Sequence, residues 1–392
     1  MLSYLLGGLA MAWAWVFPQQ LFLLSFVGLI PLFRNLHKPL FEELKNYLLF
    51  FSIWIGVSGF WLSNYSFDAF IFGFGSHVLW YLAILILSRL VSSKTPKYSP
   101  LVLVFVWMVA DLLVATIPGF IPWYQLGNGF ISTTSFDGLI AEIGVYWLSF
   151  LVLIINMYLF LCIKLKSYFS LILGVLLLLL PMFFNPNTQL ESSSEIKIGL
   201  VQPHIKNPTS NLLEVNHVVD LIVYPEGYLN KELVSESSIL SGGYLKNKSD
   251  EFNVAMFSES NIKYIKRRLL PYVENVINGS DNGFSKGEEN VIFTLKNGLT
   301  FQPIICIESV FSDLFDKSEA DFFVVITNDS WFQGSSAYFL HANHCKVRAL
   351  ESGKTVVRVG NTGISGAFYP TGMTETISPE YKGIKTMQVK IY

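Results

Sequence analysis

"FFNPNTQLESSSEIKIGLVQP", residues 183–203, marks the point at which the sequence changes character. Long apolar stretches precede it, and short β-rich runs separated by turn or helix signals follow it. The chain of 392 residues is 52% hydrophobic and only 14% charged, which is too apolar for an ordinary soluble protein of two domains. The sequence therefore predicts a membrane bundle in residues 1–186 and an α/β domain in residues 187–392.

The first part reads as about seven helices, most of them close to the ~20 residues needed to cross a bilayer. The apolar stretches are 2–16, 19–33, 47–64, 69–92, 99–118, 138–163 and 168–184. The first stretch lacks the basic start of a signal peptide, and another apolar stretch follows at once. We therefore expect it to remain as a helix.

Charges in the connections predict the orientation, because Lys and Arg collect in cytoplasmic loops. The basic residues of alternate connections are Arg34, Lys38 and Lys45, then Arg89, Lys94 and Lys97, then Lys164 and Lys166. The other connections, near 17–18, 65–68 and 119–137, have no Lys or Arg. This alternation places the N-terminus in the cytoplasm and the α/β domain outside the cytoplasmic membrane.

Composition and cysteine count exclude several classes of function. A net charge of −2 without a basic stripe argues against nucleic-acid binding. "HANH" (341–344) lacks further ligands at the expected offset, so we predict neither a metal nor another cofactor. Three cysteines are too few for a disulfide framework, although a disulfide between Cys306 and Cys345 is an alternative to a free thiol.

Three segments of the α/β part carry residues suited to chemistry. "IVYPEGYL" runs as a strand to Glu226, "YIKRRLLPYVE" contains Lys266 and Glu274, and "FQPIICIESVF" (301–311) contains Cys306 and Glu308. If the last segment is one strand, its two-residue period puts Cys306 and Glu308 on the same face. A buried carboxylate costs several kcal/mol unless it is paired, so we expect Lys266 or another donor beside Glu308.

A cysteine needs a base or a nearby cation to become a good nucleophile. The six histidines form no recognisable Cys/His motif, but a glutamate in an apolar pocket can serve as the base. A lysine can stabilise both the thiolate and an oxyanion. A lone cysteine in a strand is more often a small core residue, so the catalytic interpretation depends on all three residue types converging.

Glu226 after "YP", Lys266 in "YxKRxLxP" and Cys306 in "CxE" resemble, in order and context, the Glu-Lys-Cys triad of the nitrilase superfamily. With the helices upstream, the chain resembles the apolipoprotein N-acyltransferase family. The segments that carry this resemblance are "MAWAWVFPQQLFLLSFVGLIPLF" (11–33), "PWYQLGN" (122–128), "LVQP" (200–203), "YIKRRLLPYVE" (264–274), "CIE" (306–308), "TNDSWF" (327–332), "KVRALESGKTVVRVGNTGISG" (346–366) and "YPTG" (369–372).

The resemblance implies a multi-pass α-helical membrane bundle followed by a nitrilase-like α-β-β-α sandwich in roughly residues 195–392. It implies an acyl transfer in which Cys306 takes an acyl chain from a phospholipid as a thioester. The acceptor would be the α-amine of the N-terminal diacylglyceryl-cysteine of a bacterial apolipoprotein. The location implied is the bacterial inner membrane, with the lipid bilayer as a partner, no nucleic acid, and a monomeric enzyme.

Residue roles follow from the same resemblance. Glu226 would be the general base, and Lys266 with the backbone N–H of Ile307 would hold the oxyanion. Glu274 and Glu308 would orient Lys266 and Cys306. Trp123, Tyr124, Asn328 and Trp331 are candidates for lining the substrate path.

Two other functions remain open. A different nitrilase-type membrane amidase or acyltransferase would keep the triad but need a polar pocket. A transporter, or a scaffold that has lost catalysis, would have a triad that does not converge, or would turn Asp111 and Glu142 of the apolar helices toward a shared cavity.

Overall fold

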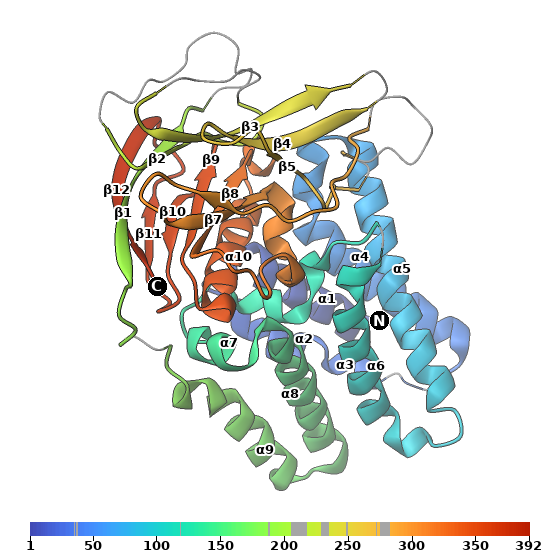
Figure 1. Cartoon of the computed structure of the whole chain (residues 1–392). Coiled ribbons are helices and arrows are strands. Elements are labelled where there is room, and N and C mark those ends of the chain that lie inside the picture. The colour runs from blue at the N-terminus through green and yellow to red at the C-terminus, as the bar shows by residue number, and fades with distance from the viewer. Residues whose placement is uncertain are drawn as a thin grey trace. The chain divides into compact units, whose positions relative to one another are not determined.

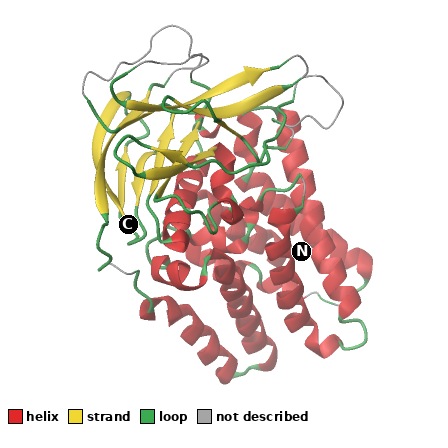
Figure 2. Ribbon diagram, viewed as in Figure 1, coloured by secondary structure: helices red, strands yellow, loops and turns green. Residues whose placement is uncertain are grey.

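A helical part and a sheet-rich part divide the chain (Figures 1 and 2). The computed structural model describes residues 1–34, 36, 38–117, 119–186, 189–204, 218–228, 235–247, 250–271, 273–274 and 283–392. The helical unit comprises Met1–Asn185 with Gly334–Ala337, and the α/β unit comprises Pro186–Gln333 with Tyr338–Tyr392. The two units are described separately below.

The helical unit is built from nine α-helices and short 3-10 turns within the described residues. The α-helices are α1 (Leu2–Val16), α2 (Ser25–Gly28), α3 (Ile30–Arg34), α4 (Leu40–Ser58), α5 (Phe67–Val91), α6 (Ser99–Leu113), α7 (Asp137–Ile143), α8 (Val145–Leu165) and α9 (Tyr168–Leu179). Three spans among the described residues are long and apolar enough to cross a membrane, namely Phe67–Val91, Pro96–Thr116 and Val145–Leu165. The chain is accordingly membrane-associated.

The expected single helix over 19–33 is wrong, because this stretch forms a 3-10 turn (Phe22–Leu24), α2 and α3. Pro31 has no N–H to continue the helical ladder. Asn156 of α8 takes over the backbone groups at the break: its Oδ1 accepts from Leu29 N–H at 3.0 Å, and its Nδ2 donates to Ser25 O at 2.8 Å. A buried side chain of another helix thus stabilises the interruption.

The next helix, α4, begins at Leu40 rather than at the expected residue 47. Its first turn holds Glu42 and Glu43, which suits the positive end of the helix dipole. Arg89 of α5 pairs with the buried Glu43 and donates to the carbonyl of Lys38 at 2.7 Å. Two of the basic connections therefore meet in space.

The α/β unit contains two six-stranded sheets (Figure 1). The first has the order β12-β1-β2-β3-β4-β5 and the second the order β11-β10-β9-β8-β7-β6. The strands are β1 (Ser194–Gln202), β2 (Leu221–Val223), β3 (Ser238–Lys246), β4 (Glu251–Phe257), β5 (Lys263–Ile265), β6 (Phe293–Thr294), β7 (Thr300–Ile305), β8 (Phe322–Thr327), β9 (Val356–Gly360), β10 (Ser365–Phe368), β11 (Thr374–Ile377) and β12 (Gly383–Ile391).

Side chains of both sheets form one hydrophobic core, which includes Ile198 and Leu240 from the first sheet and Phe301, Val324 and Val357 from the second. The expectation of two packed sheets is confirmed, and the short β-rich runs expected after residue 186 form strands, among them β1, β2, β4, β7, β8 and β9. Strands β1, β2 and β3 are parallel, and so are β7, β8 and β9. Parallel strands buried on both faces need continuous apolar runs, such as the fully buried "FFVVIT" of β8.

Helix α10 (Ala337–Ser352) connects β8 to β9 and supplies a helical layer of the sandwich. A helix of two or three turns fits the sequence of residues 208–220, but 205–217 lie outside the described residues.

Candidate active site

Four residues that the sequence singles out follow directly, or within three residues, the carboxyl ends of strands. Glu226 follows β2, Lys266 follows β5, Cys306 follows β7 and Asn328 follows β8. Carboxyl ends of strands are where α/β folds place their ligands and catalytic groups. The fold thus gathers residues that lie up to 102 positions apart in the sequence.

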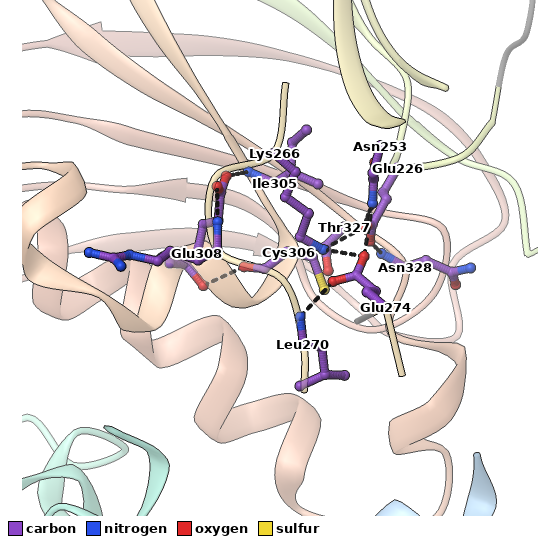
Figure 3. Close-up of polar contacts among 12 residues, drawn as sticks. Glu226, Asn253, Lys266, Leu270, Glu274, Ile305, Cys306, Glu308, Thr327 and Asn328 are labelled. Atoms are coloured by element: carbon purple, nitrogen blue, oxygen red, sulfur yellow. Dashed lines mark hydrogen bonds and ion pairs between the residues drawn. The ribbon is translucent and has the colours of Figure 1, made fainter. Parts of the chain in front are cut away.

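Lys266 lies between two carboxylates (Figure 3). Its Nζ lies 2.7 Å from Glu274 Oε1 and 3.1 Å from Glu226 Oε1. Asn253 of β4 donates its side-chain amide to the same two oxygens, at 2.8 Å to Glu226 and 3.0 Å to Glu274. Both glutamates and the lysine are buried, so the charges are compensated by one another and not by water.

Each glutamate is also held by a backbone N–H. Glu226 Oε2 accepts from the N–H of Asn328 at 3.0 Å, and Glu274 Oε2 accepts from the N–H of Leu270 at 2.8 Å. Together with Asn253 and Lys266, these donors fix the orientation of both carboxylates. One oxygen of each therefore faces the lysine.

Cys306 lies at a sharp break in the chain, and the expectation that "FQPIICIESVF" is one strand is wrong. Strand β7 ends at Ile305, and Cys306–Val310 is a 3-10 helix. Cys306 has a φ of 55°, a left-handed conformation that is strained for a residue with a side chain. Because the strand ends before Cys306, the two-residue period does not relate it to Glu308.

The thiol of Cys306 interacts electrostatically with Glu226, Lys266 and Glu274, and Figure 3 shows its sulfur beside them. Burial, followed by the charge of Glu226, raises the pKa of Cys306, while Lys266 lowers it. Burial alone would lower the pKa of Lys266, but Glu226 and Glu274 raise it well above its ordinary value. The resting site therefore holds a neutral thiol beside a lysine that stays protonated.

Glu308 is buried and is satisfied by four donors, none of which is the ammonium of Lys266 in the described part of the chain. Its Oε1 accepts from the N–H groups of Arg267 at 2.6 Å and Arg268 at 3.0 Å. Its Oε2 accepts from Ile305 N–H at 2.8 Å and from the Tyr264 hydroxyl at 2.9 Å. Burial raises the pKa of Glu308. Glu308 thus ties the turn after β5 to the turn after β7.

The remaining expected site residues fall in different places. Ile307 is the buried second residue of the Cys306–Val310 turn. Trp331 is half-buried and donates its indole N–H to the carbonyl of Asn328, beside Glu226. Trp123 and Tyr124 lie in the helical unit, where both are buried and Tyr124 contacts the rings of other aromatic residues.

The arrangement does not favour a transporter. Asp111 is buried in the helical unit, whereas Glu142 is exposed. All three cysteines are free, which excludes the disulfide between Cys306 and Cys345. Within the described residues no cluster of His, Cys, Asp or Glu has the geometry of a metal site.

Sequence reasoning missed Asn253 and Tyr264, the side chains that complete the hydrogen bonding of Glu226, Glu274 and Glu308. It also missed β3, where Gly242 passes so close to Glu226 that an added Cβ would lie 2.5 Å from its Cα. Glycines inside a strand often mark such an approach. "SGGY" (241–244) was therefore an available signal.

Known proteins resemble both parts of the chain. Residues 7–158 match the model of the apolipoprotein N-acyltransferase N-terminal domain family. The chain is similar to apolipoprotein N-acyltransferases. It is 27% identical over 335 residues to the apolipoprotein N-acyltransferase of Wigglesworthia glossinidia brevipalpis, covering 70% of this chain and 66% of that protein. It is 26% identical over 338 residues to that of Rickettsia bellii, covering 71% and 67%. The chain thus spans about two thirds of the length of these relatives.

Solved structures similar to this chain include an amidase of the nitrilase superfamily from Nesterenkonia AN1. That comparison has a TM-score of 0.38 and 14% sequence identity, and it covers 51% of this chain and 92% of the amidase. A glutamine-dependent NAD(+) synthetase from Cytophaga hutchinsonii gives a TM-score of 0.35 at 13% identity, covering 50% of this chain and 43% of the synthetase.

Proposed function

We propose that this chain is an N-acyltransferase that moves an acyl chain from a phospholipid, through a thioester on Cys306, to the N-terminal diacylglyceryl-cysteine of apolipoproteins. The observation that carries the proposal is the convergence of Glu226, Lys266 and Cys306 in one buried cluster. The names of its relatives support an apolipoprotein as the acceptor.

In the first half-reaction Cys306 Sγ attacks the carbonyl carbon of the phospholipid ester, while Glu226 takes the thiol proton. The tetrahedral oxyanion is held by Lys266 and the backbone N–H of Ile307. When the C–O bond breaks, Glu226 returns the proton to the leaving alkoxide. The products are a lysophospholipid and an acyl thioester.

The charges of the cluster suit this step. The site begins with two carboxylates and one ammonium, and proton transfer moves one negative charge from Glu226 to the sulfur. Lys266 contacts Glu226 and interacts electrostatically with the sulfur of Cys306. The negative charge therefore stays close to the ammonium group before and after the proton transfer. Glu274 stays paired with Lys266 throughout and keeps it protonated.

In the second half-reaction the free α-amine of the acceptor attacks the thioester, and Glu226 takes a proton from the amine. The C–S bond breaks, and the thiolate recovers its proton from Glu226. Breaking the reaction into two steps lets one base and one cation serve both nucleophiles. All the groups named lie in one chain, so we propose a monomeric enzyme.

We further propose that residues 1–186 form a membrane bundle and that residues 187–392 form the catalytic domain on the outer side of the bacterial inner membrane. The contact of Arg89 with Glu43 and the Lys38 carbonyl supports a common side for two basic connections. Both substrates are lipids, and Trp123, Tyr124, Asn328 and Trp331 are proposed to line their path.

The test is transfer to a synthetic diacylglyceryl-cysteine peptide by the full chain in phospholipid micelles. We expect the peptide to gain one acyl chain as an amide on its α-amine, and the same peptide with an acetylated amine to gain none. Release of free fatty acid without a change in peptide mass would instead indicate a hydrolase and refute the transferase.

A further inference from the structure

A second buried polar cluster lies next to the active site and is not used by the mechanism above. Asp329 Oδ2 lies 2.6 Å from Arg358 Nη2, and Asp329 Oδ1 accepts from the Thr327 hydroxyl at 2.9 Å. His341 Nδ1 lies 3.0 Å from both Asp329 Oδ1 and Arg358 Nη2. All four side chains are fully buried, and they come from the end of β8, from β9 and from α10.

The cluster surrounds the turn that orients Glu226. Asn328, whose N–H donates to Glu226 Oε2, lies between Thr327 and Asp329, and both of these neighbours have side chains in the cluster. The turn is also tightly packed from the other side, since a Cβ on Gly363 would lie 2.7 Å from Asp329 Oδ2. Asn328 therefore cannot shift its N–H without disturbing the contacts of Asp329.

The same cluster reaches the nucleophile. Burial, followed by the charge of Arg358, lowers the pKa of His341, while Asp329 and a hydrogen bond with the backbone of Cys306 oppose this. Asp329 also acts electrostatically on the Cys306 thiol. His341 thus lies against Asp329 and Arg358 through its Nδ1, and it interacts electrostatically with the backbone of the strained Cys306 turn.

We propose that Asp329, Arg358 and His341 form a positioning cluster that holds the turn at Asn328 and the turn at Cys306 in a fixed mutual geometry, so that Glu226 faces the thiol. The proposal rests on the proposed function, in which Glu226 is the base for Cys306. None of the three side chains takes part in bond making. Their effect on the reaction passes through Glu226 and Cys306.

The physical reason for such a cluster is the strain at Cys306. A non-glycine residue with positive φ costs on the order of 1–3 kcal/mol and persists only where the surroundings hold it. The ion pair of Asp329 with Arg358 is neutral as a whole, and Arg358 Nε also donates to the carbonyl of Ile364, so the pair adds rigidity without adding net charge to the site.

The test is alkylation of Cys306 by iodoacetamide in the full chain in detergent micelles, followed between pH 6 and 10 by mass analysis of the Cys306 peptide. Asp329→Asn is expected to slow alkylation at pH 7.5 by about tenfold or more, because the base is no longer held against the thiol. Its pH profile should also differ from that of the wild type, because the position of Glu226 and the charge of Asp329 both act on the Cys306 thiol. A role in stability alone would not move this profile.

Two further variants keep the experiment decisive. Thr327→Val keeps the size and removes one hydrogen bond to Asp329, so it should stay folded and slow alkylation by about threefold to fivefold. Asp321 lies at the opposite end of β8, where its Oδ2 accepts from Thr300. Asp321→Asn is the matched control and should alkylate at the wild-type rate. If Asp329→Asn does not fold, the alkylation rate and pH profile of Thr327→Val test the proposal instead.

A wild-type rate and pH profile in folded Thr327→Val and Asp329→Asn would overturn the proposal. The readout does not use an acyl substrate, so its failure is distinct from failure of the proposed function. If the wild-type chain takes no acyl group but the variants alkylate as expected, the positioning cluster stands and the acyltransferase proposal fails.

Discussion

The backbone N–H of Asn328 donates to Glu226 Oε2 at 3.0 Å, although 102 positions separate the two residues. This bond joins the second sheet to the first at the carboxylate proposed as the base. The other oxygen of Glu226 is shared by Asn253 and Lys266. The base is therefore oriented by contacts from three separate segments, and its geometry depends on both sheets.

Lys266 is expected to be essential for activity. Its contribution to stability, in contrast, should depend on the buried carboxylates that it neutralises. Lys266→Met leaves two buried carboxylates without a cation and should lower both the melting temperature and acyl transfer, the latter by about 100-fold or more. Adding Glu274→Gln removes one of those charges and should restore melting temperature without restoring activity. A double variant that regains activity would show that the ammonium is not catalytic.

Asn253 is expected to be an essential positioning residue. Asn253→Leu removes both hydrogen bonds to Glu226 and Glu274 and should slow thioester formation by about tenfold or more, at about 1 kcal/mol per bond. Asn253→Asp should be worse, because it adds a third carboxylate to the cluster. Asn297→Ala, in the exposed turn between β6 and β7, is the control and should behave as wild type. If thioester formation were equally fast in all three variants, Asn253 would have no positioning role in the site.

Glu308 should make stability fall as pH rises above the ordinary range of a carboxyl. Burial raises the pKa of Glu308 from 4.5, so the folded state binds a proton more tightly than the unfolded state. This contribution is fully present below pH 4.5 and is lost as pH rises through the folded-state pKa. Denaturant midpoints of the wild type and Glu308→Gln, measured across this range, should converge at low pH and differ most at high pH.

Asp329, in contrast to Glu308, should make the folded state less stable as the pH falls below the ordinary range of a carboxyl group. Arg358 and His341 outweigh burial and lower the pKa of Asp329 from 3.8 to about 2. Its stabilisation is present above pH 3.8 and is lost as pH falls toward 2, on the order of 2 kcal/mol in total. Asp329→Asn should remove that acid-dependent step from the denaturant midpoint. If the denaturant midpoint of Asp329→Asn fell by the same amount at acid pH, the loss of stability would come from another titrating group.

The sequence predicts a helical part and an α/β part well, because apolar helices and fully buried strands leave strong patterns, whereas the two packed sheets were implied by the resemblance to the nitrilase superfamily. It predicts the break over 19–33 poorly, since the hydrogen bonds that replace the helical ladder come from Asn156, more than a hundred residues away. The strand at 301–311 was misread because hydrophobicity continues through a turn whose φ at Cys306 no pattern records.

The candidate site could be named residue by residue only where a motif surrounds each residue, as at Glu226, Lys266 and Cys306. The donors to Glu308 could not be predicted, because three of them are backbone N–H groups, which every sequence contains. Asn253 lies in an ordinary strand sequence, "EFNVAMF", and only the antiparallel pairing of β4 with β5 brings it to Lys266.

The most direct test of the central claim is the intact mass of the full chain after incubation with phospholipid and no acceptor. The account predicts a gain of one acyl group on Cys306 that hydroxylamine releases as a thioester. Cys306→Ser should remain folded and gain none, since Glu226 is not arranged to activate a hydroxyl of far higher pKa, whereas Cys345→Ala should gain the group as the wild type does. An acyl group found on Cys345, or retained by Cys306→Ala, would contradict the account.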